Sequence, residues 1–258
     1  MVKLFESFRN ESINLELPRI INWYTCGPTV YDDSHIGHAR TFITYDILRN
    51  YLESIGHHVL YTMNITDIDD KIMAKVKRLH WKNLLEKLDE MYDISGWNDE
   101  IVENKLLKFF TEDEITPPME LFHQFVDREE IKFWKDMQSI KVRLPFAKIR
   151  VTQVHDDIMK FIEKLIDNNM AYVSNGSVYF DTQKYKTLHN PSLSLHMDNN
   201  DDMNLKNNFT TDKRHPHDFS LWKAKKKYEI SFDSPWGPGH VSWHTECSVM
   251  INKLFGND

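Results

Sequence analysis

The beginning of the chain alternates short apolar runs with one longer amphipathic segment. Residues 20–25 are apolar and rich in β-branched and aromatic side chains, so they predict a strand. Cys26, Gly27 and Pro28 follow with residue types that favour a turn. Residues 59–63 repeat the apolar pattern and predict a second strand. The segment between the two strands is long enough to hold a helix.

A helical period runs through that intervening segment and begins near residue 36. Apolar side chains recur at steps of three and four residues, as on the face that a helix turns toward a protein core. Gly56 stands where a glycine commonly caps the C-terminus of a helix. The apolar stripe comprises Ala39, Ile43, Ile47, Leu48, Tyr51 and Leu52, and another face comprises Phe42, Asp46, Arg49 and Glu53.

The order strand, helix, strand within residues 20–63 predicts a βαβ unit. Two strands of such a unit lie parallel and are joined by a right-handed crossover. Parallel sheets carry helices on their faces and bind ligands at the carboxyl ends of their strands. We therefore expect an α/β fold with a doubly wound parallel sheet.

The middle of the chain has a different pattern. Residues 76–140 are charged and carry apolar side chains at helical spacing, interrupted at residues 116–118, so they predict a helical insertion. Residues 154–166 form an amphipathic helix, and residues 177–181 predict a short strand. Residues 193–212 are rich in Asn and Asp and predict a loop. We exclude a calcium loop in this stretch, because its glycine and glutamate positions hold Met203 and Phe209.

The composition is that of an ordinary globular protein, with 41% hydrophobic and 28% charged residues among 258. The net charge of −7 argues against a protein that holds nucleic acid mainly by bulk charge. A local basic patch, residues 223–227, is a candidate for contacts with RNA phosphates, although a solvated loop has the same pattern.

The presence of only two cysteines, Cys26 and Cys247, argues against a disulfide scaffold and favours a reducing compartment. The N-terminus lacks the apolar run of a secretory signal. No stretch reaches the roughly 20 apolar residues that span a bilayer. These features predict a cytoplasmic protein with no membrane partner.

Residues 26–40 carry the most chemical information. His35-Ile36-Gly37-His38 places two imidazoles around a glycine at the start of the predicted helix. The glycine lets a ligand approach the backbone, and the N-terminus of a helix attracts phosphates. Two imidazoles can donate hydrogen bonds to the charge that builds on a triphosphate during displacement at its α-phosphorus. An isolated pair of histidines can equally be capping or core residues.

Three motifs and one weaker region of the chain resemble one known family. Residues 26–40 closely resemble the HIGH signature of class I aminoacyl-tRNA synthetases, in the form found in cysteinyl-tRNA synthetases. Residues 63–72 resemble that family's second-strand motif, and residues 149–181 are more weakly similar to its connective region. The insertion resembles that of eukaryotic-type members. The third motif comprises Asp218–Lys223, Pro235–Gly239 and Trp243–Ser248.

The resemblance implies a Rossmann-like, HIGH-type nucleotidyl transferase fold and a cysteine–tRNA ligase activity. Such an enzyme uses ATP with Mg²⁺ to convert cysteine to cysteinyl-adenylate and then transfers the cysteinyl group to tRNA(Cys). Positioning and electrostatics do most of this work. The implied division is a first half of the catalytic domain (1–76), the helical insertion (77–140), the connective region (141–235) and the start of the second half (236–258).

The resemblance also assigns residues to the site. His35 and His38 are the implied catalytic residues. The implied ATP-binding residues are Gly27, Thr29, His35, Gly37 and His38, and the implied cysteine-binding residues are Thr66, Asp67, Trp243 and His244. Residues 66 and 67 could instead cap the following helix, and a tryptophan at 243 could belong to the core.

The spacing of Cys26 and Cys247 alone does not make a metal site, and two unrelated buried thiols would have the same pattern. The resemblance implies that both bind Zn²⁺, with a His and a Glu from a later His-His-x-Asn-Glu segment, and that the zinc takes the substrate thiol as thiolate. An apolar pocket separates serine from cysteine poorly. A bond between a soft thiolate and zinc separates them well.

The sequence ends just where the family continues into that segment and into a Lys-Met-Ser-Lys-Ser-type loop. We therefore expect a fragment with little or no full aminoacylation activity. Two alternatives remain open. One is a paralogous cysteine ligase that gives its cysteine to an amino sugar, and the other is a binding protein derived from a truncated synthetase.

Overall fold

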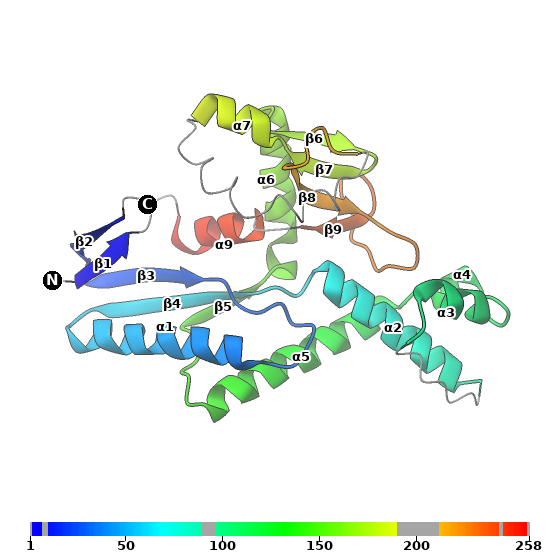
Figure 1. The fold of residues 1–258 in the computed structure, drawn as a ribbon, viewed down its shortest axis with the longest axis horizontal. Coiled ribbons are helices and arrows are strands. Elements are labelled where there is room, and N and C mark those ends of the chain that lie inside the picture. Colours follow the sequence, from blue (N-terminus) through cyan, green and yellow to red (C-terminus); the bar gives the residue numbers. More distant parts are fainter. Residues whose placement is uncertain (1, 7–9, 89–95, 190–211, 243–244, 257–258) are drawn as a thin grey trace.

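A computed structural model describes residues 2–6, 10–88, 96–189, 212–242 and 245–256 of the chain. A parallel sheet and a larger antiparallel sheet form two layers, and the helix α9 (Thr245–Phe255) lies between them (Figure 1). A separate hairpin lies at the N-terminus and consists of β1 (Val2–Glu6) and β2 (Glu11–Leu15). No helix within the described ranges is both long and apolar enough to cross a membrane.

The parallel sheet has the order β3-β4-β5, formed by Ile20–Thr25, His58–Ile65 and Ala147–Arg150. The first two strands pair in register from Ile20 opposite His58 to Thr25 opposite Met63. Between them α1 runs over Ile36–Ser54, and Gly56 follows it with a φ of 100°, which favours glycine. The predicted βαβ unit is confirmed.

Helices cover both faces of this sheet. Trp23 turns toward α1, where its ring lies 5.9 Å from that of Tyr45. The next residue, Tyr24, faces the opposite way, and its hydroxyl lies 3.5 Å from the sulfur of Met250 in α9. Because successive side chains of a strand point to opposite faces, α1 and α9 lie on opposite sides of the sheet. The doubly wound α/β architecture is therefore confirmed.

The predicted orientation of α1 is wrong. Its apolar stripe is largely exposed, and Ile47 is 61% accessible to solvent. The face that turns inward carries the buried Phe42 together with charged side chains. These charges are tolerated because Arg143, from the segment before β5, donates to Asp46 at 2.9 Å and to Glu53 at 2.7 Å. Ion pairing thus replaces apolar packing on much of this face.

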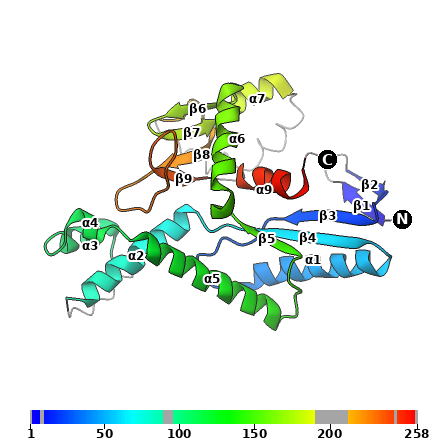
Figure 2. The same ribbon diagram turned by 180° about the vertical axis from the view of Figure 1, so that it is seen from behind.

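The described part of the connection from β4 to β5 contains four helices, and it extends to one side of the sheet (Figures 1 and 2). The last of them, α5, crosses back and packs Phe133 and Met137 against the sheet. The predicted boundary at residue 76 falls inside α2, and β5 joins the parallel sheet although it lies in the predicted connective region. The four helices are α2 (Asp70–Glu86), α3 (Asp99–Leu106), α4 (Glu112–Ile115) and α5 (Met119–Ser139).

The antiparallel sheet has the order β6-β7-β8-β9, formed by Ala171–Ser174, Ser177–Phe180, Phe219–Ala224 and Gly239–Val241. A short 3₁₀ turn (Thr152–Val154) and α6 (His155–Asp167) lead into it, and α7 (Thr182–His189) follows β7. The predicted helix at 154–166 and strand at 177–181 are confirmed. Most of the predicted loop at 193–212 lies outside the described residues.

One hydrophobic cluster joins the two sheets. Ile65 and Ile72, at the end of β4 and in α2, belong to the same buried cluster as Trp222 of β8 and Met250 of α9. Burial of apolar surface stabilises this arrangement without fixing an orientation, because the hydrophobic effect has no direction. Polar contacts between the two layers add directional interactions to this packing.

We predict that Arg143→Met lowers the free energy of unfolding by about 1–2 kcal/mol, because Asp46 and Glu53 then lose their shared cation. Urea denaturation monitored by circular dichroism measures this change. Lys82→Met is the matched control, since Lys82 lies 3.8 Å from Glu86 in an exposed pair of one helix. Equal stability of the two variants would contradict a role for Arg143 in holding α1.

Candidate functional site

The candidate site begins where β3 and β4 end. The segments that follow these strands are joined by backbone hydrogen bonds, from Thr66 N to Pro28 O at 3.0 Å and from Val30 N to Thr66 O at 3.2 Å. Asn64 strengthens the junction, because its side chain accepts a hydrogen bond from Gly27 N and donates one to the Thr66 hydroxyl. The carboxyl ends of the two strands therefore form one rigid edge.

The close approach of the segment after β3 to the end of β4 requires a glycine at position 27. A Cβ atom on residue 27 would lie 1.8 Å from the carbonyl oxygen of Asn64 and 2.7 Å from the side chain of Met63. The first of these atoms belongs to the backbone and cannot turn away. Glycine at this position therefore lets the chain pass over β4 directly after Cys26.

Cys26 and Cys247 meet at this edge, with their sulfur atoms 3.6 Å apart. Cys26 follows β3 directly and is exposed, whereas Cys247 lies in the first turn of α9 and is half-buried. Burial raises the pKa of the Cys247 thiol to about 12. The structure thus brings together the two cysteines that the resemblance implied as metal ligands.

A cavity of about 1020 Å³ opens beside the cysteine pair. One wall comes from the strand ends and includes Thr29, Thr66 and Asp69. The opposite wall comes from the antiparallel sheet and includes Ser220 and Lys223. The cavity is large enough for a ligand the size of an amino acid joined to a nucleotide.

The two sulfurs suit one edge of a zinc coordination shell. Two Zn–S bonds of about 2.3 Å at a tetrahedral angle place the sulfurs about 3.8 Å apart. Within the described part of the chain, however, no three His, Cys, Asp or Glu side chains come together as metal ligands. The described residues therefore supply two soft donors of the four that zinc prefers.

The implied cysteine-binding residues differ in their placement. Thr66 lines the cavity. Asp67 is buried, and its carboxylate accepts hydrogen bonds from the backbone and hydroxyl of Thr152 at 3.1 and 2.5 Å. Burial raises the pKa of Asp67, which these hydrogen bonds partly offset. Trp243 and His244 lie outside the described residues.

His35 and His38 cap α1. His35 Nδ1 accepts a hydrogen bond from Gly37 N at 3.1 Å, and His38 Nδ1 accepts one from His35 N at 3.3 Å. The two rings stack with centroids 4.0 Å apart. Burial and the neighbouring His35 lower the pKa of His38, which favours its neutral form. Since each Nδ1 accepts, each neutral ring carries its proton on Nε2.

The implied ATP-binding residues do not all line one cavity. Gly27 and Thr29 line the cavity beside the cysteines. His35 lines a second cavity of about 490 Å³, together with Lys132 and Lys135 of α5. Gly37 makes room for the imidazole of His35, because a Cβ on residue 37 would lie 2.8 Å from that ring.

The comparisons with known proteins agree with this architecture. A family model described as the class I (C) tRNA synthetase catalytic domain matches residues 13–258. The chain belongs to that family. The matched range includes the parallel sheet, α1 and both cysteines.

Relatives of the chain are similar over almost all of its length. It is 37% identical over 100% of its length to a protein named cysteine–tRNA ligase from Encephalitozoon cuniculi, of which it covers 45%. It is 31% identical over 93% of its length to one from Xenopus laevis, of which it covers 42%. This member of the class I (C) family thus spans about half the length of the curated relatives that it matches.

A solved structure shares the fold. It is described as a candidate arginyl-tRNA synthetase from Campylobacter jejuni, and it aligns with 94% of this chain and 46% of its own at a TM-score of 0.53. The sequence identity is 12%, so this likeness concerns the fold alone.

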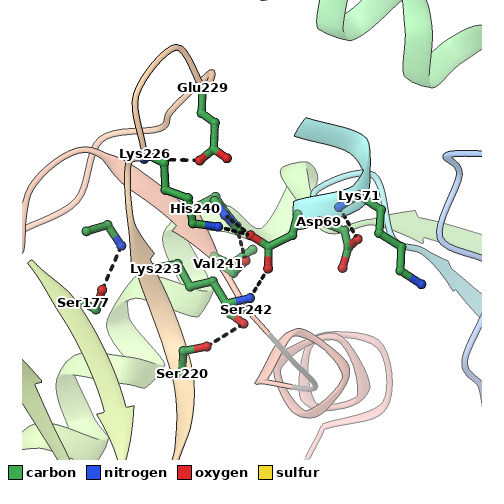
Figure 3. A network of polar contacts seen from close by, with 12 residues as sticks. Asp69, Lys71, Ser177, Ser220, Lys223, Lys226, Glu229, His240, Val241 and Ser242 are labelled. Carbon is green, nitrogen blue, oxygen red and sulfur yellow. Dashed lines mark hydrogen bonds and ion pairs between the residues drawn. The ribbon is translucent and has the colours of Figure 1, made fainter. Parts of the chain in front are cut away.

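The sequence did not predict a polar network across the cavity of this synthetase-family chain. Asp70 of α2 contacts Lys223, Lys226 and His240 of the antiparallel sheet and the turn after β8. These three basic residues are labelled in Figure 3. The basic patch predicted for RNA is thus partly ion-paired within the protein, and Lys227 also lies 2.7 Å from Glu103. Asp70 and Lys223 are 153 positions apart in the sequence, so local sequence patterns could not predict that they form a pair.

The sequence also did not predict Glu246 as a site residue. It is buried in the first turn of α9, and it lines the cavity beside Cys247. Among the described residues its Oε2 atom has no hydrogen-bond partner. Burial raises the pKa of Glu246, and the carboxylate of Asp69 raises it further. Its position directly before Cys247 in the third motif was the available signal.

We predict that Gly27→Ala lowers the free energy of unfolding by about 2–3 kcal/mol, because the new methyl group overlaps the backbone of Asn64. Gly96→Ala is the matched control, since a Cβ there meets no atom within 4 Å. Urea denaturation should show a change within about 0.5 kcal/mol for the control. A Gly27→Ala variant as stable as the control would contradict the close packing of the two strand ends.

Proposed function

We propose that this chain is the N-terminal catalytic part of a cysteine–tRNA ligase. The enzyme would activate cysteine with ATP to cysteinyl-adenylate and transfer the cysteinyl group to tRNA(Cys). The observation that carries the proposal is the meeting of Cys26 and Cys247, 3.6 Å apart, at the strand ends of a class I synthetase fold. Similarity to proteins named cysteine–tRNA ligase favours tRNA over an amino sugar as acceptor.

In the first step the carboxylate of cysteine attacks the α-phosphorus of ATP and pyrophosphate leaves. We assign ATP binding to Gly27, Thr29, His35, Gly37 and His38, and catalysis to the two histidines. Their capping role supports this assignment, because acceptance at Nδ1 leaves the Nε2–H of each ring as a donor for a phosphate oxygen. Donors that are already oriented need little reorganisation when charge builds on the phosphates.

The cysteine subsite is proposed at the cysteine pair, with Thr66, Asp67, Trp243 and His244 around it. Cys26 and Cys247 would hold Zn²⁺ together with ligands from beyond the described residues. When bound, the metal supplies a soft Lewis acid for the substrate thiolate, a bond that the hydroxyl of serine does not match. The spacing of the two sulfurs supports this assignment, and cysteine selection depends on it.

Cobalt binding tests the metal assignment. We predict that the chain takes up Co²⁺ with the near-ultraviolet absorption of thiolate ligation and that Zn²⁺ displaces it. Cys26→Ser and Cys247→Ser should each reduce that absorption by about half or more, since one thiolate is removed. Ser248→Ala, an exposed neighbour in α9, should leave it unchanged. Undiminished absorption in both serine variants would contradict the assignment.

Binding of a non-hydrolysable adenylate tests the function itself. We predict that a cysteinyl-sulfamoyl adenosine binds the zinc-supplemented chain at least about tenfold more tightly than its seryl counterpart, as isothermal titration calorimetry can measure. His38→Ala should weaken both analogues by a similar factor, because the histidine acts on the nucleotide side. Equal affinity for the two analogues in the unaltered chain would remove the case for cysteine selection.

A further inference from the structure

The carboxylate of Asp70 is bound by three basic side chains from the other layer of the molecule. Asp70 is the first residue of α2, close after β4 of the parallel sheet. It contacts the ammonium group of Lys223, and its Oδ1 atom lies 3.3 Å from Lys226 Nζ and 3.4 Å from His240 Nε2. Figure 3 shows the side chains of Lys223, Lys226 and His240 reaching from β8, the turn after it and β9 toward the start of α2.

These partners are themselves held firmly. His240 is 2% exposed, and its Nδ1 atom lies 2.9 Å from the carbonyl oxygen of Val241. Lys223 is opposite His240 in the pairing of β8 with β9. A Cβ on Gly239 would lie 2.1 Å from the carbonyl oxygen of Lys223, so the two strands are in close contact. The side chains at 223 and 240 therefore move with the sheet that carries them.

The carboxylate is charged at neutral pH. The close contacts with His240 and Lys223 hold the pKa of Asp70 well below its usual range, although burial opposes them. Hydrogen bonds to a charged group are stronger and more directional than those between neutral groups. The contacts of Asp70 therefore differ in kind from the apolar packing that also joins the two layers.

The two ends of this network lead to the two cysteines. On one side, Asp70 follows Thr66 by four residues, and Thr66 is hydrogen-bonded to the segment directly after Cys26. On the other side, His240 lies in β9, and Cys247 follows seven residues later in α9. Each cysteine is thus a few residues along the chain from one partner of the contact between Asp70 and His240.

We propose that Asp70 is a positioning residue that sets the separation of Cys26 and Cys247. It does so by fixing β8 and β9 against the start of α2 through Lys223 and His240. The role rests on the proposed function of the cysteine pair in cysteine selection. Without Asp70 the hydrophobic cluster would still join the layers, because it includes Ile72, Trp222 and Val241. The range of distances between the two thiols would become wider.

Equilibration with glutathione measures the separation without metal or substrate. Oxidised glutathione takes two electrons and two protons from the two thiols, so that its own disulfide bond breaks, one protein disulfide forms and two molecules of reduced glutathione are released. The equilibrium constant reports the effective concentration of one thiol toward the other. We predict that Asp70→Asn lowers this constant about tenfold in the 258-residue chain, because the neutral amide binds its cationic partners weakly.

Asp99→Asn is the matched control. Asp99 of α3 also binds two cations, Lys77 at 2.7 Å and Arg78 at 2.8 Å, but it does not line the cavity beside the cysteines. Both variants should shift the melting temperature by similar amounts, and only Asp70→Asn should change the glutathione equilibrium. If Asp70→Asn fails to fold, Lys223→Met removes the contact from the other side and should lower the constant in the same direction.

An unchanged constant in folded Asp70→Asn or Lys223→Met would overturn the positioning role, and so would an equal decrease in Asp99→Asn. A wild-type chain whose thiols do not pair at all would overturn it too. The glutathione measurement involves no metal or adenylate, so it separates failure of the positioning role from failure of the proposed function. If only the proposed function is wrong, the constant still falls in Asp70→Asn, while cobalt or adenylate binding fails in the unaltered chain.

Discussion

The pairing of the segments after β3 and β4 is the constraint on which the rest of the structure depends. Two backbone hydrogen bonds around Thr66 hold these segments together where the parallel strands end. Because both strands end at the same edge, the side chains that follow them gather there. Gly27 allows this approach, and Cys26 is thereby fixed at the mouth of the cavity.

The partner of Cys26 reaches the site only after a long excursion of the chain. The two cysteines are 221 positions apart, and the helical insertion and the antiparallel sheet lie between them in sequence. Closing so long a loop costs entropy, which the hydrophobic cluster across both layers must offset. Apolar packing brings α9 onto the sheet, and the polar contacts of Asp70 with Lys223 and His240 restrict how the antiparallel layer is placed.

The sequence predicted what local patterns encode. The βαβ unit follows from two apolar runs and a helical period, and the structure confirms it between residues 20 and 65. The inward face of α1 was predicted wrongly, because a periodicity shows that a helix has faces but not which partner each one meets. Arg143 lies 90 positions from Glu53, and its ion pairs reverse the expected orientation. Asp70 and Lys223 escaped prediction for the same reason.

The two histidines show how a structural and a chemical role can share one arrangement. A cap needs only one acceptor nitrogen from each imidazole, and the Nδ1 atoms of His35 and His38 provide it. Acceptance at Nδ1 fixes the tautomer, so that each Nε2 becomes a donor. A phosphate at the helix N-terminus would therefore meet two oriented N–H groups without displacing either capping hydrogen bond. Capping and phosphate binding, which the sequence left as alternatives, are compatible in this geometry.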